Sequence, residues 1–281
     1  MWRVFGTGRA AVGPGKVAPC ISEAIKEAVQ KPPRHLGQSF STWSARTLCL
    51  FVLSLFGVLL SARTLLRELR RLGFRLIRPV LSIASPDPDY SVKLAQLDEL
   101  KERARRGEIV LLFEDEVDLH LLPGVTRCWT PRGQQYKVMT PGQNKKRYGF
   151  GTVDFVTGQI VFLASEHKES ATFCELVKLV LKQYASESRP IVLVLDNYRI
   201  HSSKITLGGL APFKDRLSAF FLPTYSPHLN IIELLWKHLR RVVTHNYLFH
   251  NVEELINAVN DFINTMNLHP EKTLSVVGDT Q

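Results

Sequence analysis

The chain has 281 residues, of which 45% are hydrophobic and 22% are charged, and its formal net charge is +10. This composition is typical of a globular protein with enough apolar mass for one large domain or two modest ones. The cysteines are scattered, with no CxxC pair: Cys20, Cys49, Cys128 and Cys174. Their spacing argues against a disulfide framework and a structural zinc site, and it fits a reducing cytoplasm.

The positive charge is unevenly distributed. Residues 1–107 carry 18 Lys and Arg against 8 Asp and Glu, whereas residues 108–281 carry 18 of each. A basic part joined to a neutral part indicates a nucleic-acid-binding module attached to a unit with a different task. A solvated basic surface and a polybasic membrane patch are the alternatives that charge alone leaves open.

The first 30 residues show little sign of a folded domain. Residues 1–20 contain glycines and no periodicity, so we expect them to be disordered, and they lack the apolar core of a secretory signal. Residues 21–30 are compatible with a short helix, which Lys31-Pro32-Pro33 would close. We therefore predict that residues 1–30 are a disordered or truncated remnant.

Residues 48–60 form an uncharged apolar stretch that needs a separate interpretation. A membrane-spanning helix requires roughly 20 such residues, and this stretch has 13. It lies between Arg46 and Arg63 and is interrupted by Ser54 and Gly57. We expect a buried helix of a small domain and no contact with a membrane; a membrane-anchored protein is a remaining alternative.

Residues 31–80 are predicted to be a helix-turn-helix DNA-binding domain. Possible helix caps at residues 41–44 precede the apolar run, Gly57 follows it, and Ser61 can cap a second helix that ends at Gly73. A helix, a glycine-containing turn and an arginine-rich helix are typical of this motif, whose second helix enters the major groove. An amphipathic surface helix with solvated arginines is the alternative. The candidate DNA-binding residues are Arg63, Arg67, Arg70, Arg71 and Arg75.

The remaining chain is predicted to contain a linker and an α/β domain. Residues 81–107 read as a proline-rich linker and a charged helix over 91–107, residues 108–268 as the catalytic domain, and residues 269–281 as a tail. Buried or amphipathic strands are predicted at 109–113, 127–138, 147–155, 159–164, 191–195 and 218–222. Helices are predicted at 169–184, 229–243 and 252–266. Such an order indicates a mixed central sheet flanked by helices.

Three carboxylates stand where chemistry would need them. Asp115 and Asp196 each follow a short, unbroken apolar strand, and functional groups in such sheets gather where buried strands end. Glu233 lies within about 60° of Leu229 and Trp236 on a helical wheel of about 100° per residue, so it faces inward. An inward carboxylate is costly unless it is paired or binds a cation; an ion pair with Arg240 is the alternative.

Three converging carboxylates suit magnesium or manganese, which prefer hard oxygen ligands. Two such ions about 3.5–4 Å apart can activate an attacking oxygen and stabilise the leaving oxygen of a phosphodiester. The sequence therefore predicts two divalent cations, Mg²⁺ or Mn²⁺, and metal-dependent phosphoryl transfer on nucleic acid.

Four motifs in the second part of the chain are similar to those of a known family. They are FEDE (113–116), WTPRG (129–133), LDNYRIHSS (195–203) and LPTYSPHLNIIELLW (222–236). On these motifs the chain resembles DDE transposases of the bacterial insertion-sequence 630 branch of the mariner-like superfamily, over roughly residues 40–268. Asp196 and Glu233 are separated by 37 positions, close to the spacing in that family.

The resemblance implies a ribonuclease-H-like fold and cleavage at terminal inverted repeats, followed by joining of the ends to target DNA. It implies Asp115 as the first ligand, in preference to Glu114, Glu116 or Asp118. The active-site neighbours are then Glu116, Asn197 and His201; a loop histidine that caps the next helix is the alternative for His201. The implied partner is double-stranded DNA, with a homodimer when assembled on it, in the cytoplasm at the nucleoid.

The chain departs from the family pattern in three places. His228 stands where Asp is usual and Ile231 where Pro is usual, so we expect altered loop geometry rather than lost metal binding. Only the second of two usual helix-turn-helix subdomains is recognised, which suggests a truncated or frame-altered copy with weaker recognition of DNA ends. A catalytically silent DNA-binding protein and a nuclease that cuts without strand transfer are the alternative functions.

Overall fold

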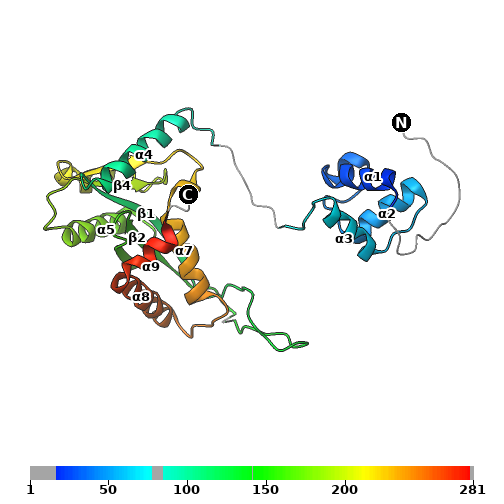
Figure 1. The fold of residues 1–281 in the computed structure, drawn as a ribbon. Helices are drawn as coiled ribbons and strands as arrows, with labels where there is room; N and C mark the ends of the chain where they lie inside the picture. Colours follow the sequence, from blue (N-terminus) through cyan, green and yellow to red (C-terminus); the bar gives the residue numbers. More distant parts are fainter. Residues whose placement is uncertain (1–16, 78–84, 141, 279–281) are drawn as a thin grey trace. The chain divides into compact units, whose positions relative to one another are not determined.

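The computed structural model describes residues 17–77, 85–140 and 142–278. These residues form two compact units, which divide between residues 82 and 83 (Figure 1). The expectations of disorder over residues 1–16 and of an irregular linker over 78–84 lie outside the described residues. Each unit has a hydrophobic core of its own.

The N-terminal unit is built from three helices: α1 (Pro19–Val29), α2 (Ala45–Phe56) and α3 (Ala62–Arg71), with a short 3-10 turn, η1 (Pro33–Leu36). The helices meet around the fully buried side chains of Ile25, Leu48 and Leu65. Leu48, Cys49 and Val52 of α2 thus belong to the core of a small domain, as the interrupted apolar stretch predicted. Leu50, Leu55 and Leu59 of the same stretch are exposed, so only one side of it is buried. In the part of the chain that the structure describes, no helix is long and apolar enough to cross a membrane.

Helix α1 corrects the predicted boundary at residue 31. Its apolar side is buried in the core of the N-terminal unit, and the Ser22 hydroxyl donates to the Glu68 carboxylate of α3 at 2.6 Å. The Trp43 indole N–H donates to the Ala28 carbonyl at 2.9 Å. The domain therefore includes α1, because these contacts join it to α2 and α3. The sequence of residues 21–30 alone does not reveal contacts with helices that follow later in the chain.

The predicted helix-turn-helix connection is present between α2 and α3. Ser44 and Thr47 form a capping box at the start of α2, and Ser61 accepts from the Thr64 N–H at the start of α3. Gly57 ends α2 at φ 67°, a left-handed conformation that favours glycine. The chain can therefore turn within the five residues 57–61 and bring Leu65 of α3 against α2.

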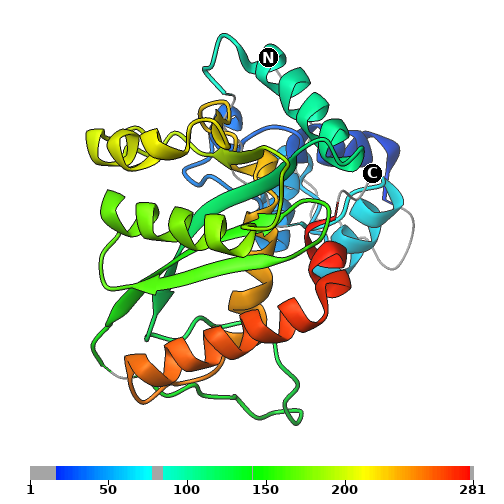
Figure 2. The same ribbon diagram turned by 90° about the vertical axis from the view of Figure 1, so that its left-hand side faces the viewer.

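The C-terminal unit contains a five-stranded sheet in the order β3-β2-β1-β4-β5 (Figure 2). The central strand β1 is antiparallel to β2 and parallel to β4, so the sheet is mixed as predicted. The strands are β1 (Val110–His120), β2 (Lys146–Asp154), β3 (Ile160–Ser165), β4 (Ile191–Leu195) and β5 (Leu217–Phe221). The α-helices are α4 (Tyr90–Arg105), α5 (Ser170–Gln183), α6 (Lys204–Leu210), α7 (Ile232–Leu239), α8 (Val252–Leu268) and α9 (Pro270–Val277).

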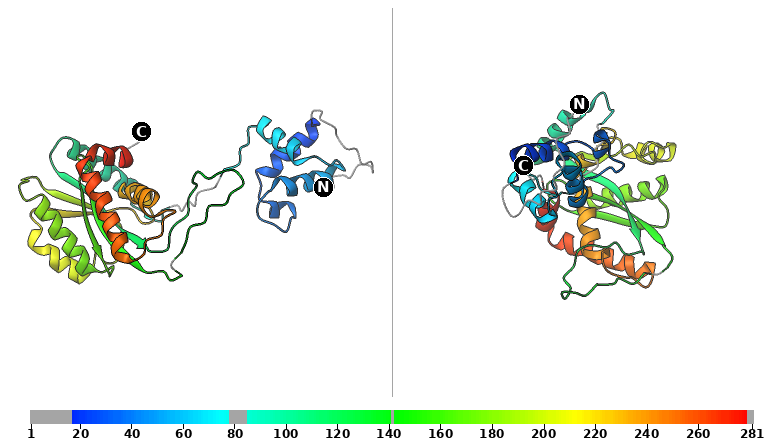
Figure 3. Two further views of the ribbon diagram at one scale, coloured as in Figure 1. Left: turned by 90° about the horizontal axis from the view of Figure 1, so that it is seen from below. Right: turned by 90° about the vertical axis from the view of Figure 1, so that its right-hand side faces the viewer.

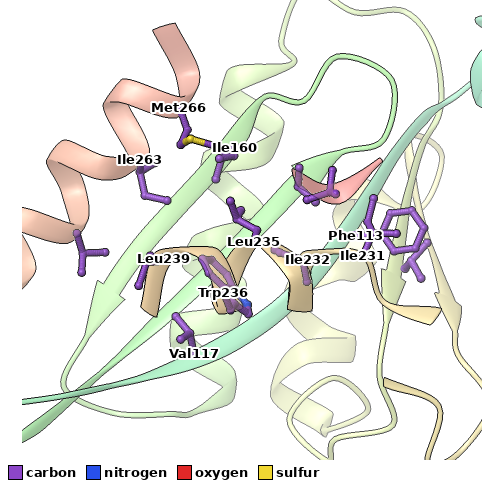
Figure 4. Close-up of a cluster of buried hydrophobic side chains, with 14 of the residues drawn as sticks. Phe113, Val117, Ile160, Ile231, Ile232, Leu235, Trp236, Leu239, Ile263 and Met266 are labelled. Carbon is purple, nitrogen blue, oxygen red and sulfur yellow. The ribbon is translucent and has the colours of Figure 1, made fainter. Parts of the chain in front are cut away.

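Helices cover both faces of the sheet. On one face, Phe113 and Val117 of β1 pack against Trp236 and its neighbours on α7 (Figure 4). On the other face, Leu112 of β1 packs with Phe173 of α5. Because side chains alternate along a strand, odd-numbered residues of β1 face α7 and even-numbered residues face α5. This alternation decides on which side each carboxylate of the FEDE segment lies.

The last helix, α9, corrects the expected tail at residues 269–281. It packs against α7 and α8, and Val277 is 2% exposed in the same core as Trp236. The helix was missed because eight residues after a proline are too short for a clear periodic signal. The catalytic domain therefore reaches at least to Val277.

Other differences concern the segments around β1 and α7. The strand predicted at residues 127–138 is absent. The described residues between β1 and β2 form a long loop (Figure 3), in which Gly124 makes an isolated bridge with His245 and Trp129 is fully exposed. The predicted helix over 229–243 is divided into a 3-10 turn η3 (Pro227–Leu229), α7 and a π-helical turn η4 (Arg240–Thr244). Helix α6 was not predicted, because the two glycines in its seven residues hide a helical pattern.

Candidate active site

The sheet register places Asp115 and Asp196 side by side. The parallel pairing of β1 and β4 ends at the pair Phe113 and Val194, and each aspartate follows two residues later. Asp196 lies just beyond the end of β4, as predicted. Asp115 corrects the prediction that it closes its strand: β1 continues to His120 because β2 remains paired with it on the other side. The apolar run ends at Phe113 only because carboxylates follow.

Glu233 lies in the first turn of α7, the helix that packs on the Asp115 face of β1. Its side chain is half-buried, and within the described residues it makes no ion pair with Arg240, so that alternative is not realised. The Asn230 side-chain amide, just before α7, donates to the main-chain carbonyl of Glu114 at 2.8 Å. This buried hydrogen bond ties the start of α7 to the main chain of β1 beside Asp115.

The electrostatics show that Asp115 lies among other carboxylates. Burial, followed by the charges of Glu233 and Glu116, raises the pKa of Asp115 to about 8. The charge of Asp196 adds to this effect. Both other predicted ligands, Glu233 and Asp196, therefore act on Asp115, and such repulsion is the situation that a bound cation relieves.

Asp196 has a different environment. Burial raises its pKa, but the His201 side chain and the backbone N–H of Tyr198, which donates to Oδ1 at 2.7 Å, lower it below its ordinary value. The neighbouring Asn197 amide donates to the Leu222 carbonyl at 2.6 Å. Asn197 thus links the end of β4 to the residue that follows β5. The sequence left the role of Asn197 open, and this hydrogen bond gives it a structural one.

The predicted neighbours Glu116 and His201 lie on the opposite face of β1 from Asp115. His201 is 2% exposed, and its Nε2 lies 3.3 Å from Asp196 Oδ1 and 3.7 Å from Glu116 Oε1. Its ring packs edge-on against Phe173, with the ring centroids 4.6 Å apart. His201 is therefore a buried group that faces carboxylates, in contrast to the alternative of a helix-capping loop histidine; Ser203 caps α6 instead.

The candidate DNA-binding arginines on α3 divide into two kinds. Arg63, Arg67 and Arg70 are exposed and stand at spacings of four and three residues, on one side of the helix. Arg71 forms a two-pronged ion pair with the buried Glu68 carboxylate, at 2.5 and 3.0 Å. Arg71 therefore stabilises the contact between α3 and α1. Arg63, Arg67 and Arg70 are available to a partner, and Arg75 is exposed beyond the end of α3.

Three residues near the site were not singled out from the sequence as part of it. Glu114 is fully buried on the α5 face of β1, and the Lys168 ammonium lies 3.4 Å from Glu116 Oε2. Asn230 was quoted within a motif but given no role. The run Glu114-Asp115-Glu116 carried a usable signal, because alternation along a strand must place its middle member on one face and its outer members on the other.

Replacing Asn230 with alanine is expected to loosen the start of α7. The buried Glu114 carbonyl would lose its side-chain donor, a change that costs on the order of 1–3 kcal/mol. We predict a lower melting temperature of the C-terminal unit by calorimetry, with lower cleavage activity. Asn197→Ala, in the loop after β4, is a matched comparison. An unchanged melting temperature for Asn230→Ala would contradict the role of Asn230 in fixing the start of α7.

Carboxylates gathered where the parallel strands of a mixed sheet end suit metal-dependent phosphoryl transfer, and comparisons with known proteins identify the family. Residues 110–256 match the family described as DDE superfamily endonuclease. The chain is 32% identical over 250 residues to the insertion element IS630 uncharacterized 39 kDa protein of Shigella sonnei, covering 89% of this chain and 72% of that protein.

Solved structures agree with this assignment at the level of the fold. The Mos1 transposase paired-end complex with left transposon end matches with a TM-score of 0.61 and 13% identity, covering 98% of this chain and 82% of that chain. The Mos1 mariner paired-end complex with Mn matches with a TM-score of 0.62 and 12% identity, covering 98% and 83%. The chain therefore belongs to the DDE superfamily endonucleases, as a transposase related to insertion element IS630, which confirms the resemblance. The structural matches agree with the predicted fold.

Proposed function

We propose that this transposase cuts DNA at terminal inverted repeats and joins the ends to target DNA, with two divalent cations held by Asp115, Asp196 and Glu233. The observation that carries the proposal is the convergence of three carboxylates from β1, β4 and α7, where Glu233 and Asp196 both raise the pKa of Asp115. A similar protein, Mos1 transposase, has been solved in complexes with Mn and with Mg. Mg²⁺ and Mn²⁺ are accordingly the cations proposed here.

The residues present fit such cations. Their donor atoms are carboxylate oxygens, the ligands that Mg²⁺ and Mn²⁺ prefer. Asp115 is pushed toward its neutral form by burial and by neighbouring negative charge, and a cation would restore the charged form. When bound, two such ions activate the attacking oxygen and stabilise the leaving oxygen of a phosphodiester. The protein itself positions the carboxylates, with Asn197 and Asn230 fixing the two loops on which they depend.

The proposed partner is double-stranded DNA, bound by the exposed arginines of α3. Recognition of two DNA ends requires two copies of the chain, so we propose a homodimer on DNA, acting at the nucleoid. The Mos1 complexes are described as paired-end and strand-transfer complexes. The alternative of a catalytically silent DNA-binding protein is not favoured. A protein that only binds DNA has no use for carboxylates that repel one another and are held together at its sheet.

Strand transfer separates a transposase from a nuclease of the same fold. The substrate is a labelled duplex that carries the inverted repeats flanking the coding sequence of this chain, mixed with a supercoiled target plasmid and Mg²⁺ or Mn²⁺. We expect nicked ends and labelled ends covalently joined to the plasmid. Cleavage without joined products would support the nuclease, and binding without cleavage in either metal would support the silent copy.

Cation binding is expected to stabilise the protein more at pH 8 than at pH 6. Folding without metal raises the pKa of Asp115 from 3.8 to about 8. Between these two pH values the Asp115 carboxyl therefore keeps its proton in the folded state and releases it in the unfolded state. Stability due to this group is therefore lost as the pH rises toward 8. Mg²⁺ replaces the proton, so its effect on the melting temperature should grow between pH 6 and 8.

The matched variant for this measurement is Asp115→Asn. It removes both the titrating carboxyl and one proposed ligand, so the pH-dependent part of the Mg²⁺ effect should disappear. An equal rise in melting temperature for the two proteins at pH 8 would count against a cation at Asp115.

A further inference from the structure

A second group of potential ligands lies on the α5 face of β1. Glu114, Glu116 and His201 place one ligand atom each within 4.8 Å of one another. His201 Nε2 lies 3.6 Å from Glu114 Oε2 and 3.7 Å from Glu116 Oε1. Because side chains alternate along β1, these two glutamates point to the face opposite Asp115. The group is therefore distinct from the proposed catalytic set, although it lies next to it.

The polar atoms of this group are buried and lack hydrogen bonds. Glu114 is 0%, Glu116 8% and His201 2% exposed. Neither oxygen of either glutamate forms a hydrogen bond, and neither nitrogen of the His201 ring does so, within the part of the chain that the structure describes. Burying charged groups without hydrogen bonds is strongly unfavourable. A ligand that accepts lone pairs from both carboxylates and the imidazole would satisfy all three side chains at once.

The distances fit a metal ion. Ligands about 2.1 Å from a tetrahedral ion are about 3.4 Å apart, and the His201 nitrogen is 3.6 and 3.7 Å from the two glutamate oxygens. Asp196 Oδ1, at 3.3 Å from the same nitrogen, is a possible fourth ligand. The two glutamate oxygens lie within 4.8 Å of each other, so small side-chain shifts would complete the coordination.

The charges also balance for one divalent ion. Glu114, Glu116 and Asp196 carry three negative charges, and the Lys168 ammonium, 3.4 Å from Glu116 Oε2, offsets one of them. An imidazole must be neutral to bind a metal ion, so the group as a whole would then carry two negative charges. Glu114 has no Lys or Arg partner among the described residues, so Lys168 neutralises Glu116 and leaves Glu114 for another cation.

We propose that Glu114, Glu116 and His201 form a separate binding site for one transition-metal ion, Mn²⁺ or Zn²⁺, on the opposite face of β1 from the catalytic carboxylates. An imidazole ligand favours these ions over Mg²⁺, which prefers oxygen. The bound ion fixes His201 and, through it, the position of Asp196. This site shares Asp196 with the proposed catalytic set but requires neither Asp115 nor Glu233, so it can be tested separately from the proposed function.

Pulsed electron paramagnetic resonance of Mn²⁺ distinguishes this site by its nitrogen ligand. The proposed catalytic ligands are all oxygens, so an ion held by them has no nitrogen ligand, whereas an ion bound at His201 shows ¹⁴N coupling. In the full-length protein we expect ¹⁴N coupling that persists in the Asp115→Asn, Glu233→Gln double variant. The coupling should disappear in His201→Gln, and the bound Mn²⁺ that carries it should be absent from Glu114→Gln.

The chain has nine histidines, so the His201→Gln variant decides whether the coupling arises at this site. Glu114→Gln keeps the size of the side chain, and a far-ultraviolet circular dichroism melt checks that each variant is folded. Coupling that persists in either variant overturns the proposal. So does wild-type protein without ¹⁴N coupling that also retains no Zn²⁺ after dialysis. Loss of cleavage with intact coupling would contradict the proposed function and leave this site standing.

Discussion

Asp115→Asn is expected to lower the rate of end cleavage by at least about 10³-fold, while binding of the DNA ends changes little. A catalytic cation contributes several kcal/mol of transition-state stabilisation, and about 1.4 kcal/mol corresponds to a tenfold change in rate. The substitution keeps the size of the side chain but removes the negative charge that a cation needs. Single-turnover cleavage of labelled end duplex, with binding measured in Ca²⁺, separates the two effects.

Asp118→Asn is the matched control for this prediction. Asp118 lies on the same strand, but its side chain is 44% exposed beside Lys146 and His120. Removing its charge should leave the cleavage rate within a few-fold of the wild type. Equal losses in the two variants would show that cleavage depends on the net charge of β1 and not on a ligand at Asp115.

The second large effect is expected on DNA affinity. Removing Arg63, Arg67 and Arg70 together should lower affinity on the order of 10²-fold at 0.1 M salt, because each arginine that neutralises a phosphate contributes about 0.9 to the salt slope. The slope of log affinity against log salt should therefore fall by about 2.7. Fluorescence anisotropy with labelled end duplex over a range of salt concentrations measures both quantities.

The control removes the same charge from the same unit. Lys26, Lys31 and Arg34 are exposed on α1 and the turn that follows it, away from α3 in sequence. Their triple alanine variant should change the slope much less if α3 is the DNA-binding helix. A larger drop in affinity for this control would assign the DNA-binding surface to α1. Arg71 is left intact in both variants because its ion pair with Glu68 stabilises the unit.

Much of the fold was predictable because its signals are local. The runs 109–113 and 191–195 are buried strands, and Ser61 and Gly57 are the caps that the sequence predicted. The predictions that failed concerned segments whose structure depends on long-range contacts. Residues 127–138 have a strand-like composition but no partner strand, and α1 and α9 gain their stability from helices distant in sequence. Local pattern does not contain that information.

The candidate site was predictable in its parts and not in its layout. Asp115 and Asp196 followed from strand position, and their side-by-side placement follows from the register Phe113 with Val194. Glu233 was found because an inward carboxylate on an apolar helix is unusual. The buried group around His201 could not be found, because it depends on α5, β1 and the loop after β4 meeting on one face of the sheet.

Anomalous diffraction from a Mn²⁺-soaked crystal of the protein with a cleaved DNA end would show whether Asp115, Asp196 and Glu233 hold two divalent cations. We expect two Mn²⁺ peaks within coordination distance of these carboxylates, next to the 3′ oxygen of the cut strand. Mn²⁺ found elsewhere in the crystal, with none contacting Asp115, would contradict this assignment.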